Sequence, residues 1–373
     1  MTMVKEYRVR CKFIAMTSHV VVEATCTRNE THFTLLIPGL PDDLSLLCLA
    51  RVPRRYHNLL RTVCKRWKEC GSSELFYSLR KILGVVEGWV YVLSRDKSEC
   101  LRWHVLDPLA KRWMQLPNMP DGCLRRYGMA CEVLDMQLFV MGGCGKYENP
   151  TNEVLRYDPL RNIWREAPCM ETPRCYFGSG VFNGQIYAIG GMGSTSGALT
   201  SWEVYDKKSK QWSSYDDPNI VSDLGESLVL DGRIYVRHAC PSFIPPSCAW
   251  VHNPEQNTWD TIDNEMMQRW CGPATAVGDD IYMLDQTLGI KLMLLDKETN
   301  SWNSVGRLST HSIRPTCRIA AVGNSLYVVG RGLKALVLNL EKVQNHRGLL
   351  VTSSINGLEC SDEIIVSCNI IEL

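Results

Sequence analysis

The sequence predicts a mainly β protein, a six-bladed β-propeller preceded by a small α-helical domain. Six short apolar strands recur along the 373 residues, and their central aromatic residues lie 48, 48, 48, 47 and 45 positions apart. These aromatics are Tyr91, Phe139, Tyr187, Tyr235, Tyr282 and Tyr327. A repeat of about 40 to 50 residues built from short strands is typical of a propeller. Residues 36–76 differ, because their apolar residues recur at helical spacing.

A second marker follows each of the first five strands, an Asp or Asn that precedes a Trp by six residues. The pairs are Asp107 and Trp113, Asp158 and Trp164, Asp206 and Trp212, Asn253 and Trp259, and Asp296 and Trp302. An Asp or Asn suits a turn between strands, because its side chain can accept hydrogen bonds from the nearby backbone. We expect each Trp to fill the space between neighbouring blades with its large apolar face.

The end of the chain predicts how the propeller closes. The sixth repeat lacks the Trp, and the final apolar run, residues 363–373, is one strand more than that blade needs. We expect this run to pair with the first blade, because closure removes exposed sheet edges. The predicted domains are a poorly ordered extension (1–34), the helical domain (35–78) and the propeller (79–373). A degenerate seventh blade stays an alternative.

Composition excludes several classes of function. A net charge of +1 gives no electrostatic basis for binding nucleic acid or a membrane. No apolar run approaches the length of about 20 residues that spans a bilayer, and the N-terminus does not resemble a secretory signal. The 17 cysteines show no C-x-x-C spacing. We therefore expect reduced thiols in a cytoplasmic or nuclear protein.

The repeats carry a family resemblance. Two of them end the core strand in a diglycine, Gly142-Gly143 and Gly190-Gly191, and continue through the Asp turn to the Trp. This pattern of strand, diglycine, turn and Trp resembles the kelch repeat over residues 79–340. The resemblance implies four-stranded blades around a central axis.

The helical segment carries a second resemblance. About 40 residues are too few to bury all of its apolar side chains. The sequences Leu40–Leu44, Leu49–Pro53 and Val63–Trp67 resemble the F-box. The resemblance implies binding to a Skp1-like adaptor and, through it, to a cullin–RING ubiquitin ligase. It places the adaptor contact at Leu40, Pro41, Leu44, Leu47, Leu49, Val52, Pro53 and Val63. The alternative is that these residues form only the core of a small helical domain.

A candidate target surface comes from positions that are equivalent between repeats. The residue 13 positions before the core aromatic is arginine in four repeats, Arg126, Arg174, Arg269 and Arg314. A ring of guanidinium groups would suit carboxylates or phosphates on a target. The alternative is that these arginines only tie adjacent blades together. The loops after the core strands, at 145–152, 192–200 and 239–248, are further candidates.

Together these features predict a plant-type F-box/kelch-repeat protein, the substrate-recognition subunit of an SCF-type ubiquitin ligase. We expect no catalysis and no cofactor or metal, and partners limited to the adaptor complex and an unknown target protein. Two alternatives stay open, a kelch scaffold without a ligase and a kelch-propeller oxidase with a copper site. The eight histidines disfavour the oxidase, because they show no paired spacing.

Overall fold

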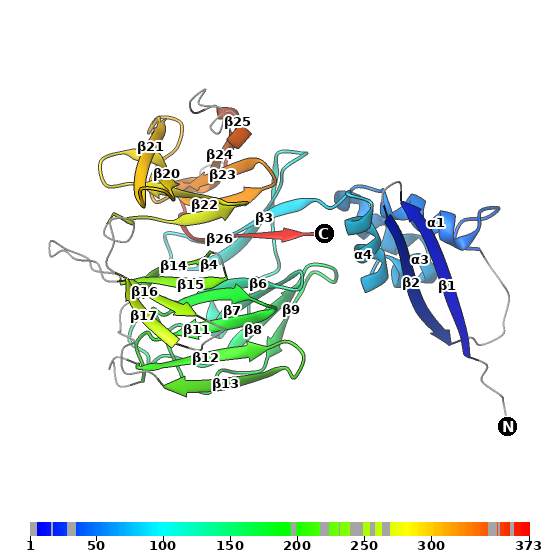
Figure 1. The fold of residues 1–373 in the computed structure, drawn as a ribbon, viewed down its shortest axis with the longest axis horizontal. Helices are drawn as coiled ribbons and strands as arrows, with labels where there is room; N and C mark the ends of the chain where they lie inside the picture. Colours follow the sequence, from blue (N-terminus) through cyan, green and yellow to red (C-terminus); the bar gives the residue numbers. More distant parts are fainter. Residues whose placement is uncertain are drawn as a thin grey trace. The chain divides into compact units, whose positions relative to one another are not determined.

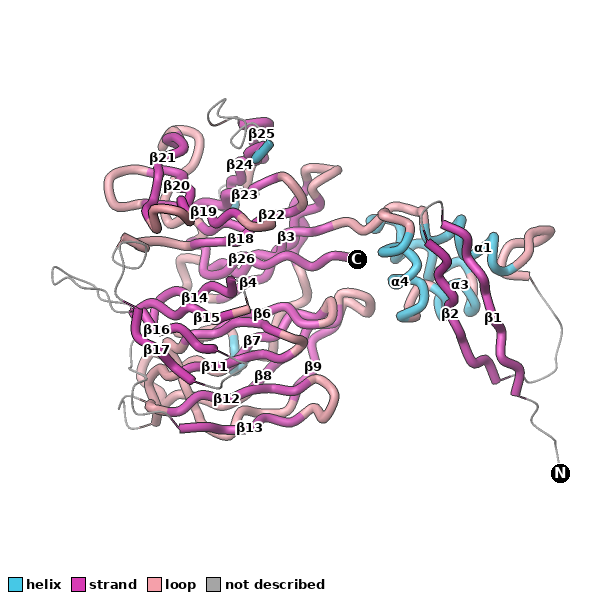
Figure 2. The backbone as a smooth tube through the Cα atoms, viewed as in Figure 1, coloured by secondary structure: helices cyan, strands magenta, loops and turns pink. Residues whose placement is uncertain are grey.

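The computed structural model divides into two units, residues 1–87 with Leu373 and residues 88–372. It describes residues 6–15, 18–27, 35–194, 199–216, 224–230, 232–238, 249–253, 258–262, 269–341, 349, 351–358 and 362–373, with only the backbone of residues 6–27. Figure 1 labels most of the elements, and Figure 2 distinguishes helices from strands by colour.

The first unit contains a hairpin and a group of short helices. The hairpin pairs β1 (Glu6–Ala15) with β2 (Ser18–Thr27), within a segment for which the sequence predicted poor order. The helices are α1 (Asp42–Ala50), η1 (Arg54–Tyr56), α2 (His57–Val63), α3 (Lys65–Cys70) and α4 (Glu74–Ile82).

Local sequence sets the ends of these helices. Pro41 directly precedes α1, and Asp42 and Asp43 occupy its first turn, where they face the positive end of the helix dipole. Cys64 has extended backbone and separates α2 from α3, while its Sγ accepts a hydrogen bond from Trp67 N. Ser73 caps α4 by accepting from Phe76 N.

Helix α4 crosses the domain boundary that the sequence predicted at residues 78/79, so the helical unit ends at Glu87 instead. The reason is a buried arginine. The Arg80 guanidinium donates to the carbonyls of Ala50, Val52 and Val85 at 2.6, 2.8 and 2.7 Å. These bonds hold the end of α1 and the segment after α4 in one structure.

The described part of the second unit contains six four-stranded antiparallel sheets, the blades of a propeller. Blade 1 consists of β26 (Ile364–Glu372), β3 (Gly88–Arg95), β4 (Leu101–Asp107) and β5 (Arg112–Gln115). Blade 2 consists of β6 (Ala130–Leu134), β7 (Gln137–Met141), β8 (Val154–Asp158) and β9 (Ile163–Ala167). Blade 3 consists of β10 (Gly178–Phe182), β11 (Gln185–Ile189), β12 (Ser201–Asp206) and β13 (Gln211–Asp216).

The other three blades repeat this order. Blade 4 consists of β14 (Leu224–Leu230), β15 (Arg233–His238), β16 (Ala249–Asn253) and β17 (Thr258–Ile262). Blade 5 consists of β18 (Ala274–Val277), β19 (Asp280–Asp285), β20 (Ile290–Asp296) and β21 (Ser301–Leu308). Blade 6 consists of β22 (Arg318–Val322), β23 (Ser325–Gly330), β24 (Lys334–Asn339) and β25 (Val351–Ile355). Two short 3₁₀ turns, η2 (Asp121–Cys123) and η3 (Arg331–Leu333), lie between strands.

The blades form a closed ring. Their first strands contact one another in the order β6, β10, β14, β18, β22 and β26, and β26 contacts β6. Blade 1 joins the two ends of the propeller sequence, because β26 pairs antiparallel with β3 from Ile364 opposite Arg95 to Glu372 opposite Gly88 (Figure 1). The prediction of a six-bladed propeller preceded by a small helical domain is confirmed.

The Asp turns form as the sequence predicts. Asp107 Oδ1 accepts from Leu109 N and Ala110 N, both at 2.9 Å. Equivalent bonds occur at three further repeats, at Asp158, Asp206 and Asp296. The turn after Asn253 lies outside the described residues.

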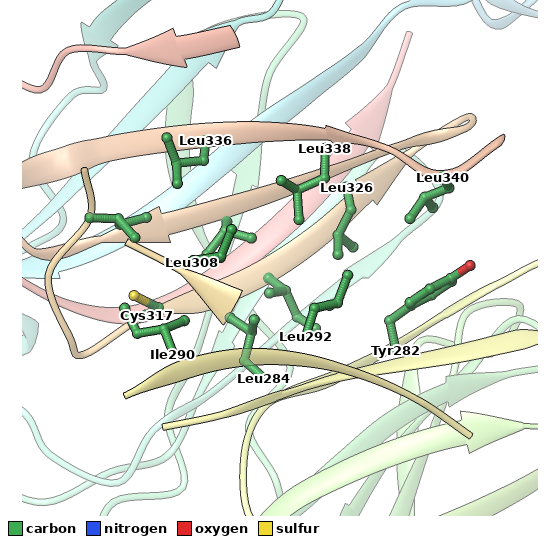
Figure 3. Packing of buried hydrophobic residues seen from close by; sticks show 13 residues of the cluster. Tyr282, Leu284, Ile290, Leu292, Leu308, Cys317, Leu326, Leu336, Leu338 and Leu340 are labelled. Atoms are coloured by element: carbon green, nitrogen blue, oxygen red, sulfur yellow. The ribbon is translucent and has the colours of Figure 1, made fainter. Parts of the chain in front are cut away.

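Four of the five repeated Trp residues pack in the core between blades, as predicted, while Trp164 is only partly buried, with its ring 6.2 Å from that of Trp103 in blade 1. Trp212 of blade 3 shares one core cluster with Phe139 and Met141 of blade 2, and its Nε1 donates to Pro168 O. In the same way Trp259 packs with blade 3, Trp302 with blade 4 and Trp113 with blade 6. Blade 6 lacks the Trp, and leucines fill this space against blade 5 (Figure 3).

Polar side chains also link the innermost strands. Ser179 Oγ of blade 3 donates to Glu132 of blade 2, and Ser227 Oγ of blade 4 donates to Ser179 O. Asn369 Nδ2 of blade 1 donates to Cys131 O of blade 2 at 3.0 Å. These bonds satisfy polar groups at the inner edge of the sheets, where water access is restricted.

A buried ion pair lies where blades 2 and 3 meet, next to their diglycines. Arg174 precedes blade 3, its side chain is fully buried, and its guanidinium pairs with Glu203 at 2.6 Å. The guanidinium also donates to Gly190 O, while Arg174 O accepts from Gly143 N. A Cβ at Gly142 would lie 2.4 Å from Arg174 O, so glycine is required for this close approach.

Replacing Arg174 by Met should destabilise the propeller, because it leaves the carboxylate of Glu203 buried without its cation. We expect a loss of about 3–5 kcal/mol in the free energy of unfolding, measured by urea denaturation. The double variant Arg174→Met, Glu203→Leu should lose much less than the sum of the two single variants. Additive losses would contradict the ion pair.

Replacing Glu132 by Gln should change how stability depends on pH. Burial raises the pKa of Glu132 to about 7, and the bond from Ser179 only partly opposes the rise. The folded protein therefore binds this proton more tightly than the unfolded chain does. The stability that this difference contributes is fully present below the pKa of the carboxyl in the unfolded chain and is lost as pH rises through about 7. At about pH 8 the Gln variant should be more stable than the wild-type protein by about 1–3 kcal/mol. This gain in stability should vanish at about pH 4.5.

Thermal unfolding followed across this pH range measures the effect. Glu166, which is exposed in blade 2, provides the matched control for removal of one charge as Glu166→Gln. An advantage of the Glu132→Gln protein that is equal at all pH values would contradict a buried, titrating carboxyl.

Candidate binding surfaces

The helical unit exposes large apolar side chains from α1, η1 and α2. Leu44 is 45% exposed, Leu59 64% and Val63 58%. Tyr56 is 48% exposed beside them in the sequence. We call these four residues the apolar surface of the helical unit. Exposed apolar side chains gathered in one small domain indicate an interaction surface.

The eight residues assigned to the adaptor contact fall into three groups. Pro41, Leu44, Pro53 and Val63 are exposed, and Leu40, Leu47 and Val52 are partly exposed. Leu49 is only 5% exposed and belongs to the core of the unit, together with Ala50 and Phe76. Leu49 is therefore a core residue of the helical domain, as the alternative interpretation states. The other seven side chains remain accessible to a partner.

The sequence motif did not include the most exposed apolar residue of this surface. Leu59 lies between the second and third F-box sequences, where the resemblance assigns no contact. Its helical spacing with Val63 was the available signal, because residues four apart share one face of a helix. Tyr56 lies at the end of η1, three positions before Leu59 and seven before Val63, so the same spacing could have marked it.

Polar contacts fix the segment before α1 against α3. Trp67 Nε1 donates to Leu36 O at 2.6 Å, and Asp42 Oδ1 accepts from Leu36 N at 2.7 Å. Asp42 also pairs with Arg66 at 2.8 Å. Burial acts to raise the pKa of Asp42, but the bonds from Leu36 and Arg66 hold it below its usual value. The Leu-Pro sequence is thus held next to α1 before any partner binds.

The four arginines of the predicted target rim have different environments. Arg174 is fully buried and does not reach the surface. For this residue the alternative holds, a role in tying adjacent blades together. Arg126 pairs with Glu153 and donates to Gly122 O. Arg314 is half-exposed and pairs with Asp362 at 3.2 Å, and Arg269 is exposed. The expected ring of four equivalent guanidinium groups is not formed, because Glu203 draws Arg174 into the protein. Target contact by the other three stays a prediction.

The loops predicted for recognition lie where the second and third strands of a blade connect. Loop 145–152 joins β7 to β8 and carries the exposed Tyr147. Residues 195–198 of the second loop and the whole of 239–248 lie outside the described residues. Nearby, the Arg95 guanidinium lies 4.0 Å from the centre of the Tyr127 ring and donates to Arg126 O.

No group of three metal-ligating side chains occurs within the described residues. The buried His252 lies among aromatic rings, 4.5 Å from Trp202 and 4.7 Å from Trp259 between ring centres. His104 is buried beside Ser94 and Glu363, and burial lowers its pKa. Both histidines contribute to packing. None of the described helices has the length and apolar character needed to span a membrane.

Comparison with known proteins agrees with both resemblances. The F-box domain model matches residues 37–79, and the Kelch motif model matches residues 125–171 and 173–219. An Arabidopsis thaliana relative, F-box/kelch-repeat protein SKIP4, is 37% identical over 91% of this chain and 95% of its own length. Another F-box/kelch-repeat protein of that plant is 32% identical over 83% of this chain and 80% of its own length.

A solved structure, described as the structure of YjhT, covers 70% of this chain and 96% of its own with 16% identity and a TM-score of 0.47. The identity to the plant relatives extends through both units, over the helical segment as well as the blades. This chain therefore belongs to the family of F-box/kelch-repeat proteins.

Proposed function

We propose that this protein is the substrate-recognition subunit of an SCF-type E3 ubiquitin ligase. The observation that carries the proposal is the apolar surface of the helical unit, Tyr56, Leu44, Leu59 and Val63, together with an F-box Leu-Pro sequence in which Leu40 is partly exposed and Pro41 exposed. The propeller differs, because the aromatic and aliphatic side chains that recur in each of its repeats are buried between blades. One unit thus keeps apolar side chains available for a partner.

The adaptor is a Skp1-like protein, and its contact buries this apolar surface. Removing apolar area from water stabilises a complex by about 25 cal/mol per Å². Asp42, bonded to Leu36 and Arg66, keeps the Leu-Pro segment in position, so little conformational entropy is lost on docking. Through the adaptor the chain joins a cullin–RING ligase, which works in the cytoplasm or the nucleus.

The propeller holds the target protein. The loops between second and third strands, and the arginines Arg126, Arg269 and Arg314 at the blade junctions, form the proposed target face. The chain makes and breaks no covalent bond in this role. Its contribution is a high effective concentration of target close to the ligase's transferring subunits.

Replacing Leu44 or Leu59 by Glu should weaken adaptor binding. Loss of one buried leucine removes about 1.5–3 kcal/mol, which is about tenfold to hundredfold in Kd, and the added charge increases the loss. Isothermal titration of the full chain with a Skp1-like adaptor measures it. Ile82→Glu is the matched control, because Ile82 is also exposed in the helical unit but lies on α4.

The alternatives give different results in the same assay. A wild-type chain that does not bind any Skp1-like adaptor would contradict the proposed function and favour a kelch scaffold without a ligase. Equal weakening by Leu44→Glu and Ile82→Glu would show that the apolar surface is not the contact. Stoichiometric copper in the purified chain would favour the oxidase alternative instead.

A further inference from the structure

Two charged side chains pair at the inner edge of the propeller, a third lies within electrostatic reach of both, and none of the three has a part in the function proposed above. They are Glu226 on β14, Arg237 on β15 and Arg318 on β22, which we call the axial charge cluster. The pairing of β14 with β15 shifts register between Leu224 and Ser227. Glu226 lies in this bulge, and bulges redirect side chains out of the regular pattern of a strand.

Arg318 places the cluster at the centre of the ring. Its Nε donates to Val366 O of blade 1 at 3.0 Å, and its Nη1 pairs with Glu226 of blade 4 at 2.6 Å. Blades 4 and 6 are not neighbours, because blade 5 lies between them in the ring. The ion pair between Arg318 and Glu226 therefore crosses the interior of the propeller.

The charges of the cluster do not cancel. Among the described residues, Glu226 is the carboxylate that pairs with Arg318, and Arg237 is a second guanidinium within electrostatic reach of both. The Nε of Arg237 is buried and has no hydrogen-bond partner among the described residues. Burial lowers the pKa of Arg237, and Glu226 only partly offsets this. Two cations thus share one carboxylate.

The neighbouring groups do not supply the missing negative charge. Burial raises the pKa of the nearby Cys271 thiol to about 11, so this thiol is neutral at physiological pH. Asp285, which interacts with that thiol, forms its own ion pair with Lys291 at 3.5 Å. The described side chains around the cluster leave a surplus of one positive charge.

A desolvated cation without a counter-ion destabilises a fold, and a ligand of opposite charge removes that cost. Guanidinium groups bind carboxylate and phosphate oxygens with paired hydrogen bonds. We propose that Arg237 and Arg318 form a binding site for an oxyanion, a carboxylate or a phosphate group, at the centre of the propeller ring. A role of this site in holding a residue of the target protein rests on the proposed function, whereas the existence of the site does not.

Thermal unfolding of the full chain tests the site with two probes, inorganic phosphate and the α-amide of N-acetylglutamate, whose side-chain carboxylate is free. Each probe is compared with sodium chloride at equal ionic strength. At least one probe should raise the melting temperature of the wild-type protein in a saturable way. A response to the glutamate derivative alone identifies a carboxylate site, and a response to phosphate alone identifies a phosphate site.

Variants assign the effect to the cluster. Arg237→Met should melt at a higher temperature than wild type without a probe and bind it at least about tenfold more weakly. Glu226→Gln, which removes the competing carboxylate, should bind the probe more tightly than wild type. Arg233→Met is the matched control, because Arg233 is exposed at the other end of the same strand and should leave the response unchanged.

Two results would overturn the site. One is a wild-type protein that responds to neither probe beyond sodium chloride, and the other is an equal response in the wild-type and Arg237→Met proteins. Titration of the same variants with a Skp1-like adaptor separates this test from the proposed function. An anion response that depends on Arg237 supports the site even where the adaptor does not bind.

Discussion

Burial of apolar side chains between neighbouring blades is the interaction on which the rest of this structure depends. A single four-stranded blade cannot cover both of its faces, so each sheet is stable only against the next one. Trp212, Trp259 and Trp302 each pack against the preceding blade, and Trp113 does so across the junction that β26 closes. Together with the leucines between blades 5 and 6, these contacts hold the blades and the axial charge cluster between them in position.

The two units handle apolar and charged side chains in opposite ways. The propeller buries its aromatics and even charged groups such as Arg174 and Glu203, and we propose its connecting loops as the recognition surface. The helical unit has too few residues to cover its own leucines, and Leu44 and Leu59 remain exposed. The proposed adaptor contact on one unit and the proposed target contact on the other rest on this difference.

Features that depend on local spacing could be predicted from the sequence. The blade repeat, the turn bonds of Asp107 and the packing of the Trp residues follow from short-range patterns. Arg174 could not be placed, because its partner Glu203 is 29 residues away on β12, which only the strand order of blade 3 brings close to the segment before β10. The axial charge cluster was missed for the same reason, since Glu226 reaches Arg318 across the ring from a bulge that no periodicity marks.

Hydrogen exchange of the full chain, followed by mass spectrometry with and without a Skp1-like adaptor, tests the central claim most directly. The account predicts slower exchange in peptides from the Leu-Pro segment, α1 and α2, with the strands of the six blades unchanged. Protection confined to the blades, or no protection in α1 and α2 at saturating adaptor, would contradict it.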